Sequence, residues 1–98
     1  MSTRQSPKSF IPKLTLFVTG TAPRSQRARA NLARMLEQLE KNDIEALEVD
    51  LIKQPEAGLS HSIFATPALL KTSNDGTVSM LYGDLTNEER LYQFLLEL

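Results

Sequence analysis

The spacing of apolar positions changes along the chain, and each spacing predicts a different element. Residues 14–18 form a short apolar run, as in a strand that is buried on both faces. From Ser25 to about Lys41, apolar residues recur every three or four positions, which predicts a helix with one apolar face. These residues are Ala28, Leu32, Met35, Leu36 and Leu39. Apolar and acidic residues then alternate over 44–52, which predicts a second strand.

The pattern after residue 62 predicts a hairpin. Two apolar runs, 67–71 and 77–82, flank Asn74-Asp75-Gly76. Asn-Gly and Asp-Gly sequences favour tight hairpin turns because these residues tolerate a positive φ angle. The two runs are therefore expected to pair in antiparallel orientation.

Two further helices are expected in the second half of the chain. A weak helical segment begins near Pro55. The last helix is expected to have Thr86 as its N-cap, with Glu89 completing a capping box. Its apolar face is formed by Leu91, Phe94, Leu95 and Leu98.

The predicted order of elements is β-α-β-(α)-β-β-α. A helix between two strands indicates a right-handed parallel unit, and the hairpin would join antiparallel beside the first strand. This is an α/β, thioredoxin-like arrangement with a four-stranded mixed sheet. We expect residues 13–98 to form this domain and residues 1–12, rich in Ser, Pro, Lys and Arg, to form a flexible N-terminal tail.

The composition argues against several classes of function. The 98 residues include no cysteine, which excludes disulfides, thiolate metal sites and thiol chemistry. The single histidine, His61, has no second ligand at metal-binding spacing, and a net charge of −1 provides no basic excess for nucleic acid. No apolar run reaches the roughly 18 residues of a membrane span, and the N-terminus lacks a signal-peptide core. We therefore expect a cytoplasmic protein that is not an enzyme and has no cofactor, nucleic-acid or membrane partner.

Charge is unevenly distributed along the sequence. Seven basic residues and no acidic one precede residue 37, whereas 12 acidic and four basic residues follow, so the two segments carry +7 and −8. This asymmetry fits a basic docking surface or self-association through complementary patches. It equally fits a solvated helix face and a basic tail, and the sequence leaves both interpretations open.

The turn after the first strand is where thioredoxin-like enzymes hold their reactive thiols. Here residues 19–25 contain hydroxyls and no sulfur, which excludes dithiol exchange. The exposed amides of this turn could bind an anion, or the hydroxyls could cap the following helix. Thr66-Pro67 stands where thioredoxin-like proteins carry a cis-proline; the alternative is a trans proline that begins a strand.

Several short segments form a characteristic pattern through their order and spacing along the chain. They are Leu14–Gly20, Pro23, Ser25, Arg27-Ala28, Asp50–Pro55, Ala65–Pro67 and Gly83–Leu85. Over about residues 13–98, this pattern resembles the KaiB family of circadian clock proteins. Gly58–Ser62 replaces the family's usual acidic stretch and lysine, and Val78 and Ser79 stand where arginines commonly follow the hairpin loop. The missing arginines argue against KaiA binding, and we favour a KaiB-like member of the non-cyanobacterial type.

The resemblance implies a non-catalytic adaptor. KaiB proteins bind the KaiC ATPase/kinase and modulate its phosphorylation or activity, in circadian timing or, in KaiB-like members, in stress response. A KaiA-like protein and a histidine kinase are further partners suggested by the resemblance. Arg27 and Lys71 match basic positions of the family's pattern, so the resemblance implies that they contact a KaiC-type partner. The alternative is that both are solvated surface charges.

The resemblance also implies a metamorphic protein. One state of KaiB is thioredoxin-like, and the other re-pairs the second half of the chain and forms tetramers, with proline isomerisation involved. A homodimer or homotetramer is therefore expected, and Thr66 and Pro67 are candidates for a structural switch. Asp75-Gly76 stands in a hairpin loop that is commonly proline-rich in the family, which favours the thioredoxin-like state.

The residues themselves leave a second function open. A thioredoxin-like small-molecule binding protein or enzyme of the glutathione type, without cysteine chemistry, could use Thr21 or Ser25 as its hydroxyl.

Overall fold

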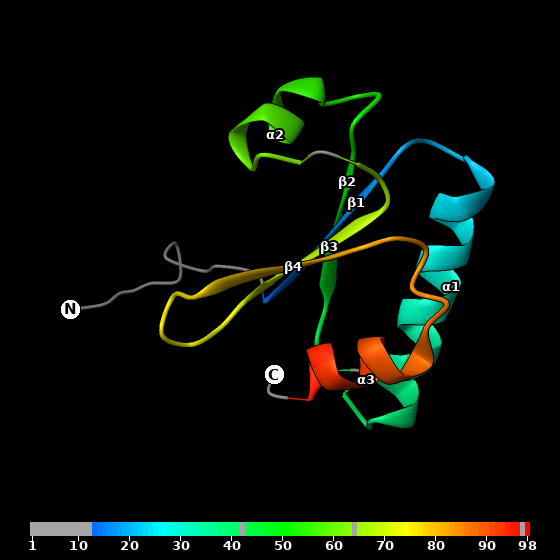
Figure 1. Ribbon diagram of the computed structural model, residues 1–98, viewed down its shortest axis with the longest axis vertical. Coiled ribbons are helices and arrows are strands. Elements are labelled where there is room, and N and C mark those ends of the chain that lie inside the picture. Colours follow the sequence, from blue (N-terminus) through cyan, green and yellow to red (C-terminus); the bar gives the residue numbers. More distant parts are fainter. Residues whose placement is uncertain (1–12, 42, 64, 97) are drawn as a thin grey trace.

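The computed structural model describes residues 13–41, 43–63, 65–96 and 98. The elements are β1 (Leu14–Val18), α1 (Pro23–Gln38), β2 (Ala46–Asp50), α2 (Pro55–Ser60), β3 (Ala68–Thr72), β4 (Val78–Tyr82) and α3 (Glu88–Leu95) (Figure 1). The predicted tail, residues 1–12, lies outside the described residues.

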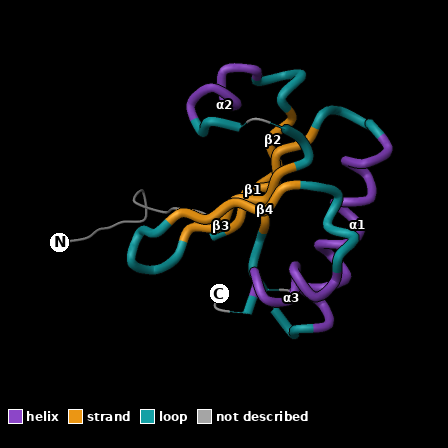
Figure 2. The backbone as a smooth tube through the Cα atoms, in the orientation of Figure 1, coloured by secondary structure: helices purple, strands orange, loops and turns teal. Residues whose placement is uncertain are grey.

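The strands form one mixed sheet in the order β2-β1-β3-β4 (Figure 2). β1 runs parallel to β2 and antiparallel to β3, and β4 pairs antiparallel with β3 through the predicted hairpin. In Figure 1, α1 and α3 lie together on one side of the sheet and α2 lies on the other. The predicted thioredoxin-like α/β class is confirmed.

The larger part of the core lies between the sheet and the pair α1 and α3. β1 is buried along its whole length, and the side chains of Leu14, Leu16 and Val18 belong to this part of the core. The predicted apolar stripe of α1 packs against them, as do Leu91 and Leu95 of α3. Burying an aliphatic side chain of this size contributes about 1.5–3 kcal/mol, so this layer supplies most of the fold's stability.

A smaller cluster lies on the opposite face of the sheet. Phe17, Ala68 and Leu70 are its buried residues, and Ala57 of α2 packs against them. None of the α2 residues is buried. This face is therefore covered only in part by α2.

Several predicted boundaries differ from the structure, and three of these differences are explained by neighbouring residues. α1 begins at Pro23 rather than Ser25, because proline fits the first position of a helix, where no amide partner is needed. β2 is shorter than 44–52: the parallel register with β1 pairs residues 46–50 only. The N-cap of α3 is Asn87 and not Thr86.

The N-cap is decided by competing hydrogen bonds. The Asn87 side chain accepts from the backbone N–H of Arg90 at 3.1 Å, which satisfies a free amide of the first turn. The Thr86 hydroxyl donates instead to Asp84 Oδ1 at 2.6 Å. Glu89 accepts from Gln93 one turn along the helix, so the predicted capping box does not form.

Candidate functional site

Hydrogen bonds among its own polar groups fix the conformation of the turn between β1 and α1. The Thr19 N–H donates to Ser25 Oγ at 3.0 Å, and the Ala22 N–H donates to the Thr19 carbonyl at 3.1 Å. Gly20 has a φ angle of +51°, in the left-handed region that glycine adopts without strain. Ser25, a candidate hydroxyl for small-molecule chemistry, is only 1% exposed.

Asp50, at the end of β2, ties this turn to the sheet. One oxygen, Oδ1, accepts from the N–H groups of Gly20 and Ile52, each at 3.0 Å. These two bonds, that of Gly20 first, hold the pKa of Asp50 below its usual value. The Gly20 amide that could have bound an external anion is thus occupied by a carboxylate of the protein itself.

Arg29 of α1 also bonds the same turn. Its Nη2 donates to the Gly20 carbonyl at 2.9 Å, and its Nε lies 3.0 Å from Glu48 Oε1. The hydrogen bond with Glu48 is the main reason that the pKa of Arg29 is raised. The turn therefore has a structural role, because Asp50 and Arg29 both bond Gly20 and connect the turn to β2 and α1.

The Thr66–Pro67 peptide bond is cis. The hydroxyl of Thr66 forms a hydrogen bond with that of Thr19, and the Pro67 carbonyl accepts from the Gly83 N–H at 2.9 Å. This segment thus lies between the β1–α1 turn and the end of β4. Its role as a structural switch stays a prediction.

Arg27 lies on α1 and binds the loop that follows β4. Its Nε is 3.0 Å from Asp84 Oδ2, and its side chain remains 53% exposed. Asn31, one turn further along α1, donates to the Asp84 carbonyl at 3.0 Å. Arg27 is therefore accessible to a partner while it also holds this loop.

Asp84 is the centre of this contact. Its carboxylate accepts from the Thr86 hydroxyl and from Arg27, and these two hydrogen bonds lower its pKa to about 2. Leu85 follows with a φ angle of +65° and is 5% exposed, so the loop turns sharply to bury this side chain. We call Arg27, Asn31, Asp84 and Thr86 the loop clasp.

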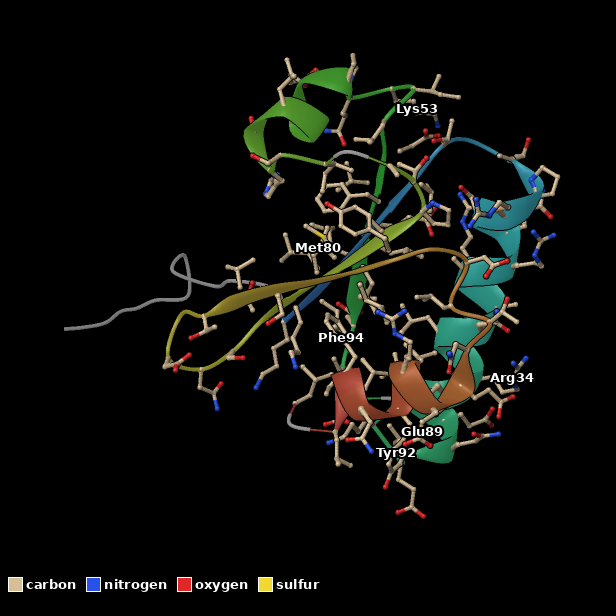
Figure 3. The ribbon with its side chains drawn as sticks, in the orientation of Figure 1. Arg34, Lys53, Met80, Glu89, Tyr92 and Phe94 are labelled. Carbon is tan, nitrogen blue, oxygen red and sulfur yellow. The ribbon has the colours of Figure 1, made fainter. Side chains whose placement is uncertain are left out.

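Lys71 does not lie on the surface. It is 8% exposed, its Nζ donates to the Phe94 carbonyl at 2.8 Å, and the ammonium lies 4.7 Å from the centre of the Phe94 ring. Figure 3 shows Phe94 between α3 and the sheet. A partner would reach this ammonium only after α3 had moved away, so direct contact by Lys71 stays a prediction that this conformation does not favour.

Arginines of α1 are partly neutralised by acidic residues from the second segment of the chain. The ion pairs are Arg27–Asp84, Arg29–Glu48 and Arg34–Glu88. Arg34 and Glu88 are the loosest pair, at 3.9 Å, and both side chains are more than half exposed. The two oppositely charged segments thus intermix in the folded protein, and the exposed arginines remain on the outer side of α1.

Potential metal ligands are dispersed in the described part of the chain. No group of three or more His, Asp or Glu side chains within it could hold a metal ion. The ring of His61 lies 5.2 Å from that of Phe17, which is a packing contact. None of the described helices is long and apolar enough to cross a membrane.

The sequence did not indicate the roles of Asp50, Arg29 and Asp84 in holding these loops. Asp50 and Gly20 are thirty positions apart and Arg27 and Asp84 fifty-seven. Two local signals exist: Asp50 and Asp84 each accept from the backbone N–H two residues further on, a spacing at which aspartate commonly bonds the following backbone. The other contacts depend on the tertiary fold.

The thioredoxin-like fold, with hydroxyls and no sulfur in its β1–α1 turn, places the chain in the class of thioredoxin-like domains without cysteine. Mitochondrial thioredoxin 3 of Saccharomyces cerevisiae shares this fold with a TM-score of 0.69 and 15% identity, covering 87% of this chain and 76% of the yeast chain. The N-terminal domain of SasA from Synechococcus elongatus matches with a TM-score of 0.67 and 27% identity, over 99% and 96% of the two chains.

The chain belongs to the KaiB family: the sequence model of the KaiB domain matches residues 15–96. The circadian clock oscillator protein KaiB of Nostoc sp. (strain PCC 7120) is 40% identical over 85 residues, which cover 86% of this chain and 75% of the relative. KaiB of Prochlorococcus marinus (strain MIT 9312) is 35% identical over 84 residues, 86% of this chain and 77% of the relative. The predicted membership is confirmed.

Proposed function

We propose that this protein is a non-catalytic regulatory adaptor that binds a KaiC-type ATPase/kinase and modulates its phosphorylation or activity. The observation that carries the proposal is the KaiB domain match over residues 15–96, on a thioredoxin-like fold whose β1–α1 turn contains hydroxyls and no sulfur. The protein would act in the cytoplasm, in circadian-type timing or in stress response.

The outer side of α1 is the proposed contact surface. Arg24, Arg27 and Arg34 are exposed there, and the first turn of the helix contains no acidic residue. A basic surface of this kind accelerates and orients docking on an acidic partner more than it adds affinity. Arg27 is the proposed central contact because its guanidinium is half exposed.

Binding is tested by size-exclusion chromatography with the KaiC homologue of the same organism, with ATP and with ADP. The wild-type chain should co-elute with the homologue, and Arg27→Glu should weaken the complex at least about tenfold, as expected when a rim contact is reversed in charge. Absence of a complex under both nucleotide conditions would contradict the proposal.

A matched variant distinguishes the loss of a contact with the partner from a change in the structure of the loop. Arg27→Glu also breaks the loop clasp, so Asp84→Asn serves as the control because it weakens the same ion pair and keeps the arginine. If Arg27 contacts the partner, Asp84→Asn retains binding. Equal loss in both variants would assign the effect to the loop and not to the partner surface.

A glutathione-type binding function is discriminated by ligand titration. The Ser25 hydroxyl is buried and already accepts from Thr19, whereas Thr21 is exposed. Saturable NMR shifts confined to residues 19–25 and 66–67 on addition of glutathione would favour that alternative. The adaptor proposal expects no such shifts.

A further inference from the structure

A hollow lies between α1 and the edge strand β2, on the face of the sheet that carries both α1 and α3. The apolar stripe of α1 packs on β1, and α3 lies over β3, where its Phe94 carbonyl accepts from Lys71. In the strand order β2-β1-β3-β4, α3 therefore leaves the side of α1 that faces β2 uncovered. The hollow on this side has a volume of about 230 Å³.

The wall of this hollow is largely aliphatic. Its apolar residues are Leu16, Leu32, Ala33, Leu36 and Ala46. The three leucines are at most 7% exposed and belong to the larger core, which fixes their positions. The two alanines, one on α1 and one on β2, keep the hollow open because a longer side chain at either position would extend into it. An apolar cavity of about 150 Å³ can hold benzene, so this hollow has room for a branched aliphatic group.

One end of the hollow is lined by two opposite charges, Arg29 and Glu48. Because α1 runs opposite to the parallel strands β1 and β2, the first half of α1 meets the end of β2, and Arg29 Nε lies 3.0 Å from Glu48 Oε1. Arg29 Nη2 also donates to the Gly20 carbonyl. In the described part of the chain, these contacts leave further N–H groups of the guanidinium and the second carboxylate oxygen open to a ligand. The two side chains are 31% and 45% exposed.

We propose that this hollow binds a free α-amino acid with a branched aliphatic side chain, such as leucine. The aliphatic side chain occupies the hollow, the α-carboxylate accepts from Arg29, and the α-ammonium donates to Glu48. This site is independent of the proposed adaptor function, since it uses the inner side of α1 and not the exposed arginines of its outer side.

The pair of opposite charges is what selects this class of ligand. A fatty acid would bring its carboxylate beside Glu48, and an aliphatic amine would bring its ammonium beside Arg29, so each would meet a like charge. Neither end of a peptide chain has both charges. A free amino acid has both at one end of its aliphatic chain, and it therefore complements the two side chains and the apolar wall together.

NMR titration of the full chain with L-leucine tests the site. A ligand of so few atoms binds weakly, and we expect a dissociation constant of about 1 mM. Saturable shifts should be centred on the residues that line the hollow, Leu16, Ala33 and Ala46 among them. The absence of a saturable shift up to about 20 mM, or shifts centred on another surface, would overturn the proposal.

Three small molecules separate the parts of the ligand. Isocaproate is leucine without its ammonium, isoamylamine is leucine without its carboxylate, and glycine has both charges but no side chain. Each should bind at least about tenfold more weakly than leucine, because each loses one of the three contacts. If isocaproate or isoamylamine binds as tightly as leucine, the assignment to an amino acid is wrong. If glycine does so, the aliphatic wall is not part of the site.

Filling the hollow is an independent test. Ala33→Leu should raise the dissociation constant of leucine at least about tenfold, because the added side chain takes the place of the ligand. Ala30→Leu is the matched control, since Ala30 is an exposed residue of the same helix outside the hollow. Equal affinities of the two variants for leucine would contradict the proposed site.

Glu48→Gln tests the charge preference without relying on the stability of the variant. This change removes the partner of the ligand ammonium and the like charge beside a ligand carboxylate. Binding of leucine should therefore weaken while binding of isocaproate becomes tighter. A general loss of structure would weaken both ligands. An unchanged ratio of the two dissociation constants would overturn the role of Glu48 and the choice of an amino acid as the ligand.

Discussion

Arg27 Nε lies 3.0 Å from Asp84 Oδ2, and this pair joins α1 to the loop that leads into α3. The loop clasp is completed by Asn31 and Thr86, which bond the backbone and side chain of the same aspartate. α1 and α3 lie on the same face of the sheet and share one part of the core. The clasp therefore links α1 to the loop before α3 through polar contacts. The core joins the same two helices through their apolar faces.

The clasp predicts an acid-dependent contribution to stability. The pKa of Asp84 is lowered from 3.8 to about 2 by Thr86 and Arg27. Because the folded-state pKa is the lower one, this contribution is complete above the unfolded value near 4 and is lost as the pH falls toward 2. Urea unfolding of wild type and Asp84→Asn should differ at neutral pH, with the wild type the more stable, and converge in acid.

Asp50 and Asp75 also have lowered pKa values, but they titrate in both proteins and cancel in this comparison. A difference between wild type and Asp84→Asn that stays constant down to pH values near 2 would contradict the assignment to Asp84.

Gly20 and Gly58 should respond to alanine in opposite directions. Gly20 has a positive φ angle, and an added Cβ would lie 3.1 Å from Ile52 Cδ1, so Gly20→Ala should destabilise by about 1–2 kcal/mol. Gly58 lies in α2, where a Cβ meets Leu51 at an ordinary 3.5 Å, so Gly58→Ala should stabilise by about 0.5–1 kcal/mol. Thermal unfolding of the two variants tests the pair, and a loss of stability in both would contradict this account of the Gly20 turn.

Lys71→Met should separate the charge of Lys71 from its packing. Methionine preserves much of the apolar stem but removes the donor to the Phe94 carbonyl, so we expect a loss of about 1–3 kcal/mol, as for a hydrogen bond from a charged group. Lys13→Met is the exposed control and should change the free energy of unfolding by less than about 0.5 kcal/mol. If the two variants unfold alike in urea, the contact with Phe94 does not stabilise α3.

Leu95→Ala tests whether α3 is held by the shared core. Leu95 is fully buried, so its truncation should cost about 2–5 kcal/mol. The adjacent Leu96 is 45% exposed, and Leu96→Ala should cost less than about 0.5 kcal/mol. Urea denaturation measures both, and similar costs would mean that α3 packs less closely than the structure indicates.

The elements and their arrangement can be predicted from the sequence because apolar spacing and turn residues are local signals. The stripe of α1, the apolar run of β1 and the Asp75-Gly76 turn each correspond to an observed element. The cap of α3 was misassigned because Asn87 and Thr86 are both good capping residues. The choice between them depends on Asp84, which takes the threonine hydroxyl.

Most of the polar contacts cannot be predicted from the sequence because they join residues that are far apart in the chain. Lys71 stands in a strand where a charged residue suggests exposure, but α3 folds over it and supplies a carbonyl and a ring. Asp50 is a strand residue whose role depends on a turn thirty positions earlier. Such contacts follow from topology, which a pattern of single residues does not encode.

The uneven covering of the sheet has a consequence for motion. α2 buries none of its own residues, and Leu59 within it is 85% exposed, whereas α1 and α3 are anchored in the larger core. Opening a segment costs roughly the contacts that it loses, so α2 can detach from the sheet and return while the strands stay paired. Its backbone amides should exchange with solvent deuterium far sooner than those of β1, through an excursion much smaller than global unfolding.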